Sequence, residues 1–246
     1  MVSSGLRVEQ LEPEFVRRLI DSASIPSVSS DPIHKDDVRR CAEYLAELIK
    51  EDGGTAQLVE TDGHPAVLGE MAIGGRGAPI LLIYNHYDVQ PADPKEWENP
   101  PFNAFYSSSR NAVFGRGATD DKGPLLTALT AAKIASQEGI GVNLKFVYEG
   151  EEESCSVHFS DVVRDNRIFF NGIDSVVFSD SLWLSSGQPA IEYGLRGNVY
   201  AHLYLKTSDN DKHSGEFGGV ARNPLAELAE VISACVDAKT GFVKIP

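Results

Sequence analysis

Acidic and imidazole side chains gather just beyond the ends of three apolar runs of this chain. Each apolar run predicts a buried strand, and in an open α/β sheet ligands bind where such strands end. One imidazole and several carboxylates at one sheet edge are the donors of a divalent metal site, and zinc suits that mixture. The groups are Asn85–Asp88 after Ile80–Tyr84, Glu149–Glu153 after Leu144–Tyr148, and Asp180 after Ser175–Ser179.

A fourth acidic pair, Asp120-Asp121, lies between the sequence GRGAT and a helix that begins near Pro124. Each group alone has an ordinary structural explanation. A run such as Glu151–Glu153 often begins a solvated helix, and an aspartate beside glycine often caps a turn. All four groups fall at the same level of consecutive strand–helix units, however, and this coincidence favours one shared site.

The order of predicted elements indicates an α/β fold. Apolar residues at helical spacing alternate with the three apolar runs, and this alternation predicts a mostly parallel sheet with helices on both faces. Two short β-like runs with an Asp62-Gly63 turn between them precede the first long run. The expected helices lie at Phe15–Ile20, Val38–Ile49, Leu125–Gln137 and Ser154–Arg164, and the two short strands at Ala56–Glu60 and Ala66–Met71.

The pattern changes near Tyr193-Gly194. Beyond this point Asn198–Leu205 alternates like a half-exposed strand, and a polar loop, Thr207–Gly219, leads to a helix with Asn223 as its N-cap. We expect residues 1–193 to form one domain and residues 194–246 to begin a smaller α+β domain. One strand and one helix are too few to close a core of their own.

Composition excludes some classes of protein. Among 246 residues the net charge is -14, which argues against a nucleic-acid surface because phosphate binding needs clustered lysine and arginine. The sequence has no apolar stretch near the ~20 residues that a membrane span needs, and no apolar segment of signal-peptide length at its start. Three widely spaced cysteines suggest no disulfide framework. We therefore expect a cytoplasmic protein.

Several strings of this sequence resemble the metal-site motifs of carnosinase-like dipeptidases. That group belongs to a wider zinc peptidase family with carboxypeptidase G, aminoacylase and succinyl-diaminopimelate desuccinylase. The resemblance runs from about residue 13 to the end of the chain. The strings, in their order, are IPSVSS, NHYDVQPA, GRGATDDKGP, EGEEES, FSDSLWL, YGLRG and KHSGEFGG.

The resemblance implies a metal-ligand set of two zinc ions, with manganese or cobalt as alternative metals. His86 binds one zinc ion, and Asp88 orients its imidazole by accepting the other ring N–H. Asp120 bridges the two ions, and the peptide bond after it is cis. Asp180 completes the first site, and Glu153 binds the second ion.

The resemblance also implies catalytic roles. Glu152 is the general base, since a zinc-activated water needs a nearby carboxylate to accept its proton. His213 reaches from one subunit into the site of its partner and stabilises the oxyanion, so a homodimer through the lid domain is expected. The implied reaction is hydrolysis of a dipeptide or another N-acyl amino acid. Residues 1–193 are then a catalytic domain without its C-terminal portion, and residues 194–246 begin a lid and dimerisation domain.

One family ligand has no counterpart in this chain. The second zinc ion of the family takes a further histidine from near the C-terminus of a longer chain, and no similar motif surrounds the other histidines, which are His34, His64, His158 and His202. Cys155 stands where the family usually has glycine. A catalytically silent, truncated homologue that acts as a scaffold is therefore the alternative hypothesis. An acidic calcium-binding protein fits less well, because His86 is a poor calcium ligand.

Overall fold

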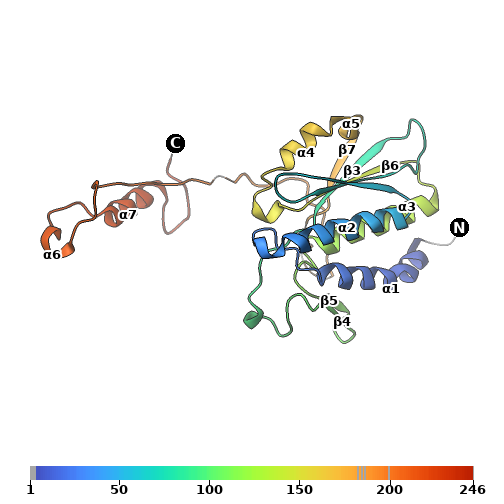
Figure 1. The fold of residues 1–246 in the computed structure, drawn as a ribbon, viewed down its shortest axis with the longest axis horizontal. Coiled ribbons are helices and arrows are strands. Elements are labelled where there is room, and N and C mark those ends of the chain that lie inside the picture. Colours follow the sequence, from blue (N-terminus) through green and yellow to red (C-terminus); the bar gives the residue numbers. More distant parts are fainter. Residues whose placement is uncertain (1–3, 182, 184, 186, 199, 246) are drawn as a thin grey trace. The chain divides into compact units, whose positions relative to one another are not determined.

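The computed structural model describes residues 4–181, 183, 185, 187–198 and 200–245. They form two compact units, Met1–Ile191 and Glu192–Pro246. In the first unit a five-stranded sheet lies between two groups of helices (Figure 1). The predicted α/β fold with helices on both faces is confirmed. The assignment of residues 1–193 to a catalytic domain and of residues 194–246 to a lid remains a prediction.

The sheet of the first unit is mixed, with the strand order β1-β2-β6-β3-β7. The central strand β3 pairs in parallel with β6 and with β7, whereas β1–β2 and β2–β6 are antiparallel. A short turn at Asp62-Gly63 joins β1 to β2, and a short hairpin connection requires antiparallel pairing. The strands are β1 (Thr55–Val59), β2 (Ala66–Met71), β3 (Ile80–His86), β6 (Asn143–Glu149) and β7 (Ser175–Phe178).

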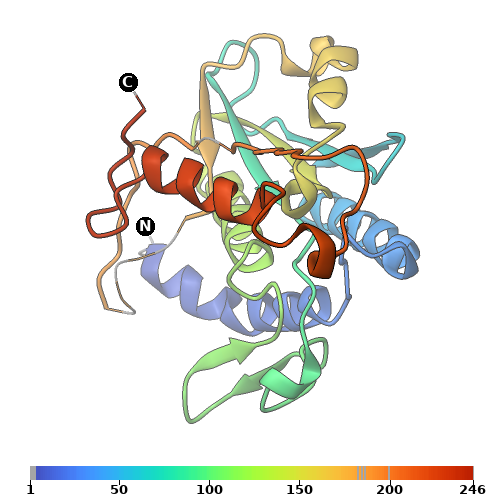
Figure 2. The same cartoon turned by 90° about the vertical axis from the view of Figure 1, so that its left-hand side faces the viewer.

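Helices cover the two faces of this sheet, and Figures 1 and 2 show α1 and α4 on opposite sides of it. The face towards α1 (Ser4–Ala23), α2 (Lys35–Glu51) and α3 (Lys122–Glu138) carries the larger core, which includes Leu45, Leu129 and Phe146. On the other face α4 (Phe159–Asp165) and α5 (Arg167–Phe170) cover a smaller cluster. Among the described residues, no helix is both long enough and apolar enough to cross a membrane.

A second, small hairpin lies outside this sheet. It consists of β4 (Phe105–Ser107) and β5 (Ala112–Phe114), whose rings Phe105 and Phe114 stack with their centroids 5.5 Å apart. Both views place it beside α1 (Figure 2). Its importance for the site is that the chain leaves β5 directly into Gly115–Asp121, the segment that carries the acidic pair.

A network of buried charges joins α1 to α2 and α3. The Arg18 guanidinium donates to both carboxylate oxygens of Asp52, at 2.6 and 3.0 Å, and the side chain of Asp52 is fully buried. Lys133 lies 3.0 Å from the same carboxylate and 2.9 Å from Glu14. Arg18 also lies 2.8 Å from Glu14, so two cations share two carboxylates, of which Asp52 is fully buried, and this arrangement fixes the helices that support the sheet.

In the second unit the described residues form the helices α6 (Ser214–Phe217) and α7 (Pro224–Cys235). The predicted cap of α7 is confirmed, because the Asn223 side chain accepts the Leu225 N–H at 3.0 Å. The strand expected over Asn198–Leu205 is wrong for the described residues 198 and 200–205, which are irregular; residue 199 lies outside them. A strand forms only against a partner strand, and Tyr200 and Tyr204 instead face solvent.

Replacement of Asp52 by alanine removes the fully buried anion of this network and leaves Glu14 as the carboxylate that Arg18 and Lys133 share. The free energy of unfolding should fall by about 1–3 kcal/mol, as expected when buried donors lose one of their partners. Asp21→Ala is the matched control because it removes an exposed pair with Arg17, a contact of the kind that contributes about 0.2–1 kcal/mol. Urea unfolding of both variants checks this, and equal losses would contradict it.

Candidate metal centre

The imidazole of His86 is the centre of the candidate site. His86 is the last residue of β3, and its side chain is 1% exposed because β6 and β7 flank the strand. The loops that leave the carboxyl ends of β3, β6 and β7 therefore meet around this ring. This is the sheet edge at which the sequence predicted a shared site.

Three carboxylates approach the Nε2 atom of His86. Asp120 Oδ1 lies 3.0 Å away, Asp180 Oδ2 3.5 Å away, and Glu152 Oε2 4.0 Å away. Burial lowers the pKa of the imidazole, but hydrogen bonds to Asp180 and Asp88 and the surrounding negative charge outweigh it and raise the pKa to about 12. Negative charge thus converges on Nε2, and a metal ion bound there would take the place of the ring proton.

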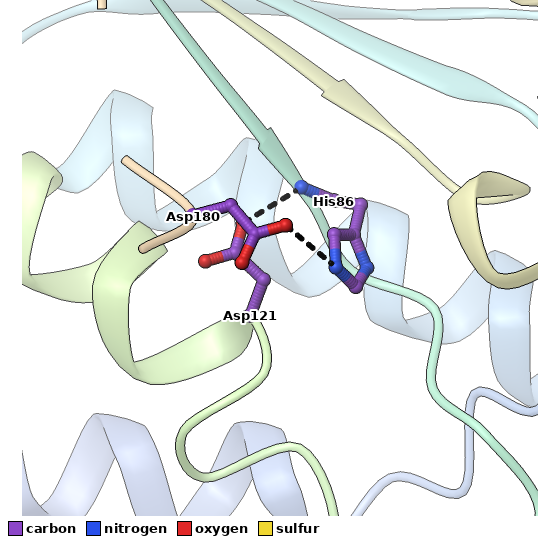
Figure 3. Close-up of side chains that lie close together, drawn as sticks. All are labelled: His86, Asp121 and Asp180. Carbon is purple, nitrogen blue, oxygen red and sulfur yellow. Dashed lines mark hydrogen bonds and ion pairs between the residues drawn. The ribbon is translucent and has the colours of Figure 1, made fainter. Parts of the chain in front are cut away.

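Asp121 is a candidate ligand that the sequence analysis did not assign. Ligand atoms of His86, Asp121 and Asp180 all lie within 4.8 Å of one another (Figure 3). Oδ2 of Asp121 accepts the side-chain N–H of Asn85 at 2.8 Å and the backbone N–H of His86 at 3.0 Å. Oδ1 of Asp121 is buried without a hydrogen-bond partner, and burial raises the pKa of this carboxyl to about 7. The sequence feature that could have indicated Asp121 as a ligand is its position directly after Asp120.

The peptide bond between Asp120 and Asp121 is cis, as the resemblance implied. The two carboxylates have different surroundings. The Asp120 side chain is 60% exposed at the mouth of the site, whereas Asp121 is fully buried beneath it. The structure thus places Asp120, the predicted bridging ligand, next to His86. Asp121 lies on the buried side of the same site.

Asp88 contacts the other ring nitrogen of His86, but mainly through its backbone. Nδ1 of His86 lies 3.0 Å from the Asp88 carbonyl oxygen and 3.5 Å from the carboxylate Oδ1. The fully buried carboxylate accepts instead the backbone N–H groups of Glu152 and Glu153, each at 3.1 Å. Asp88 therefore fixes both the ring of His86 and the turn that carries the glutamates.

The two glutamates of that turn are placed differently. The side chain of Glu152 is 40% exposed and faces His86, and its pKa is raised, first by burial and then by Glu153 and Asp88, although His86 lowers it. The carboxylate of Glu153 accepts a hydrogen bond from Gln90 at 2.8 Å. Among the described residues, Glu153 lies outside the cluster of close ligand atoms around His86.

Lys122 ties the acidic pair to the end of α1. Its fully buried ammonium group donates to the carbonyl oxygens of Ser22 and Ile25, each at 2.9 Å. Burial lowers its pKa. A cation at the C-terminal end of a helix is stabilised by the helix dipole. The Lys122 side chain therefore holds the end of α1 beside the site.

Other histidines of the first unit lie in different contacts. His34 pairs with Asp37, His64 donates through Nε2 to the Ser29 carbonyl, and His158 pairs with Glu151.

In the second unit, His213 caps α6, and its Nδ1 accepts the Gly215 N–H at 3.0 Å. This hydrogen bond leaves Nε2 of His213 as the donor. A Cβ at residue 215 would lie 2.8 Å from the imidazole, which accounts for glycine there.

The donor set around His86 fits a divalent metal ion. One imidazole nitrogen and the oxygens of Asp180 and Asp121 form the group, with Asp120 beside it. The buried Oδ1 of Asp121 has no hydrogen-bond partner, and the hydrogen bond of Nδ1 to Asp88 leaves Nε2 to face the carboxylates. Nitrogen and carboxylate ligands together suit zinc, and hard carboxylates also accept manganese.

An α/β sheet with this group at its carboxyl edge defines a candidate metalloprotein. The family model of peptidase family M20/M25/M40 matches residues 82–214, which include the strands and loops of the site. The chain belongs to this family. It is 35% identical to the Cys-Gly metallodipeptidase DUG1 of Candida albicans, over 97% of this chain and 52% of that protein. It is 34% identical to the Beta-Ala-His dipeptidase of Homo sapiens, over 96% and 49%.

Solved structures agree with this assignment. The dipeptidase Dug1p of Saccharomyces cerevisiae matches 95% of this chain and 52% of its own, with a TM-score of 0.77 and 30% identity. Human carnosine dipeptidase 1 matches 98% and 53%, with a TM-score of 0.74 and 29% identity. The chain thus spans about half the length of the relatives that it matches.

Zinc should stabilise the first unit through His86. At a zinc concentration of one hundred times its dissociation constant, the free energy of unfolding should rise by about 2.7 kcal/mol. Thermal unfolding with zinc and with a chelator measures this rise. His86→Ala should lose the response to zinc, and an equal response in both proteins would mean that zinc binds elsewhere.

Proposed function

We propose that this chain carries the metal-binding half of a zinc-dependent dipeptidase, which hydrolyses dipeptides or other N-acyl amino acids. The observation that carries the proposal is the convergence of Asp120, Asp180 and Glu152 on the buried ring of His86. Family membership and relatives named as dipeptidases support the reaction class. Because the chain spans about half of those relatives, the activity belongs to the protein as a whole.

The proposed ligands of the first zinc ion are His86, Asp120 and Asp180. Asp120 and Glu153 are the proposed ligands of a second ion. A bound zinc ion polarises the amide carbonyl and acidifies a water molecule. Asp121 is a further candidate ligand, and its carboxylate also accepts the backbone N–H of His86, while the Asp88 carbonyl oxygen accepts the N–H at Nδ1. These contacts orient Nε2 and support the assignment.

Glu152 is the proposed general base. Its partly exposed carboxylate lies beside His86, and Asp88 fixes its backbone. In this position Glu152 accepts the proton of the attacking water and then returns it to the leaving amine. Burial and the neighbouring carboxylates raise its pKa, and bound metal charge would favour the ionised form that a base requires.

Substitution of Glu152 by glutamine should separate catalysis from metal binding. Turnover of a dipeptide by the full-length protein should fall at least about 100-fold, because glutamine accepts no proton. The zinc content should stay at that of the unsubstituted protein. Asp120→Ala should instead lose zinc. Elemental analysis and a release assay for free amino acids check both, and normal turnover of Glu152→Gln would disprove the assignment.

We further propose that the enzyme is a homodimer and that His213 acts in the site of the partner subunit. In the second unit α7 has no buried residue, and its apolar residues Leu225, Val231 and Ile232 are exposed. An exposed apolar helix is available for an interface. The Nε2–H of His213 is a suitable donor to an oxyanion.

Mixed dimers test whether His213 acts across subunits. His213→Ala and Glu152→Ala proteins, each inactive alone, should regain part of the activity after they are dissociated and reassociated together. One site of each mixed dimer then has an intact Glu152 and an intact His213. Homodimers of each variant, treated in the same way, are the controls. No recovery in verified mixed dimers would place His213 in the site of its own subunit.

A silent scaffold is the second candidate function. Among the described residues a compact ligand group exists for one ion, and Glu153 lies outside it. Zinc analysis of the 246-residue chain after dialysis tests whether the chain is active as it stands. Close to two zinc ions per chain support the enzyme as it stands, whereas one or none assigns the activity to a longer protein.

The cysteines Cys41, Cys155 and Cys235 are free, which is consistent with the proposed cytoplasmic location.

A further inference from the structure

The carboxylate of Asp88 depends on a hydroxyl group that has no role in the proposed reaction. Ser29 Oγ donates to Asp88 Oδ2 at 2.6 Å, the shortest hydrogen bond that this carboxylate accepts. The same Oδ2 accepts the Glu153 N–H, and Oδ1 accepts the Glu152 N–H. The hydroxyl of Ser29 therefore sets the rotation of the carboxylate that holds both glutamates.

The segment that carries Ser29 is fixed against the loop after β3. Ser27 Oγ donates to the Tyr87 carbonyl oxygen at 2.7 Å, and the Val89 N–H donates to the Ser27 carbonyl oxygen at 3.0 Å. Ser27 and Tyr87 are fully buried. These hydrogen bonds hold the backbone of Ser29 opposite Asp88. The Ser29 hydroxyl is therefore positioned by the backbone as well as by its own hydrogen bond to Asp88.

A second set of contacts reaches the same turn from its other side. His64 Nε2 donates to the Ser29 carbonyl oxygen at 3.1 Å, and the His64 backbone N–H donates to Glu151 Oε1 at 3.1 Å. The carboxylate of Glu151, which is 8% exposed, also accepts the N–H groups of His158. A ring of contacts thus runs from Asp88 through Ser29, His64 and Glu151 back to the backbone of Glu152.

We infer that Ser29 is a positioning residue of the metal site. Its hydroxyl orients the Asp88 carboxylate, which in turn places the backbone of Glu152 and Glu153 beside His86. The consequence for the metal rests on the proposed function, whereas the consequence for the turn does not. Contacts behind the ligands of a metal site commonly change metal affinity about 10–100-fold when they are lost.

The test uses Ser29→Ala, which removes the hydroxyl, and Ser29→Thr, which keeps it. Ser30→Ala is the matched control, because Ser30 is the next residue and is exposed. In metal-free protein, hydrogen exchange at the Glu152 and Glu153 amides should become about tenfold faster or more in Ser29→Ala, as the loss of a charged hydrogen bond predicts. The amide of Phe146 in β6 should keep its exchange rate.

The second readout is zinc affinity, measured by competition with a chromophoric chelator. Ser29→Ala should bind zinc at least about tenfold more weakly, with an altered visible spectrum of the cobalt form, and Ser29→Thr should restore both. Unchanged exchange together with unchanged affinity in Ser29→Ala overturns the inference, and so does equal acceleration at Phe146. If the unsubstituted protein binds no zinc, the proposed function fails, while faster exchange of the two glutamate amides still supports the positioning role.

Discussion

The fold holds negative charge against one buried imidazole. His86 is almost completely enclosed, and three carboxylates approach its Nε2 atom from loops that follow three different elements. Such a group is stable only if a cation lies among its members, either a protonated ring or a metal ion. The surrounding structure supplies the rigidity that keeps these charges together. Lys122 anchors the acidic pair to α1, and Asp88 anchors the glutamate turn.

The topology explains how distant parts of the sequence reach one point. Strands β3, β6 and β7 are neighbours and parallel, so their carboxyl ends lie at the same edge although more than ninety positions separate His86 from Asp180. The antiparallel hairpin β1–β2 extends the sheet on the far side and brings the turn at Gly63 towards Glu151. A Cβ at residue 63 would lie 1.7 Å from Glu151 Oε1, so the close approach of the turn requires glycine.

The sequence predicted the parts of this arrangement that depend on local pattern. Apolar runs identified β3, β6 and β7, and the position of each acidic group after a run placed it at the correct edge. The contact of Asp88 with the amides of Glu152 and Glu153 was not predictable. It joins Asp88 to backbone groups that lie 64 and 65 positions further along the chain. The strand expected near Tyr200 failed for a related reason: alternation indicates a strand, but pairing is a property of the fold.

Three consecutive glutamates show how surroundings rather than residue type assign a role. Glu151 is buried and binds backbone N–H groups, so its carboxylate is occupied by the fold itself. Glu152 is partly exposed, its carboxylate lies 4.0 Å from Nε2 of His86, and burial raises its pKa. Glu153 points towards Gln90. Only the middle carboxylate combines access to solvent with closeness to the imidazole, and that combination is what proton transfer at a metal site requires.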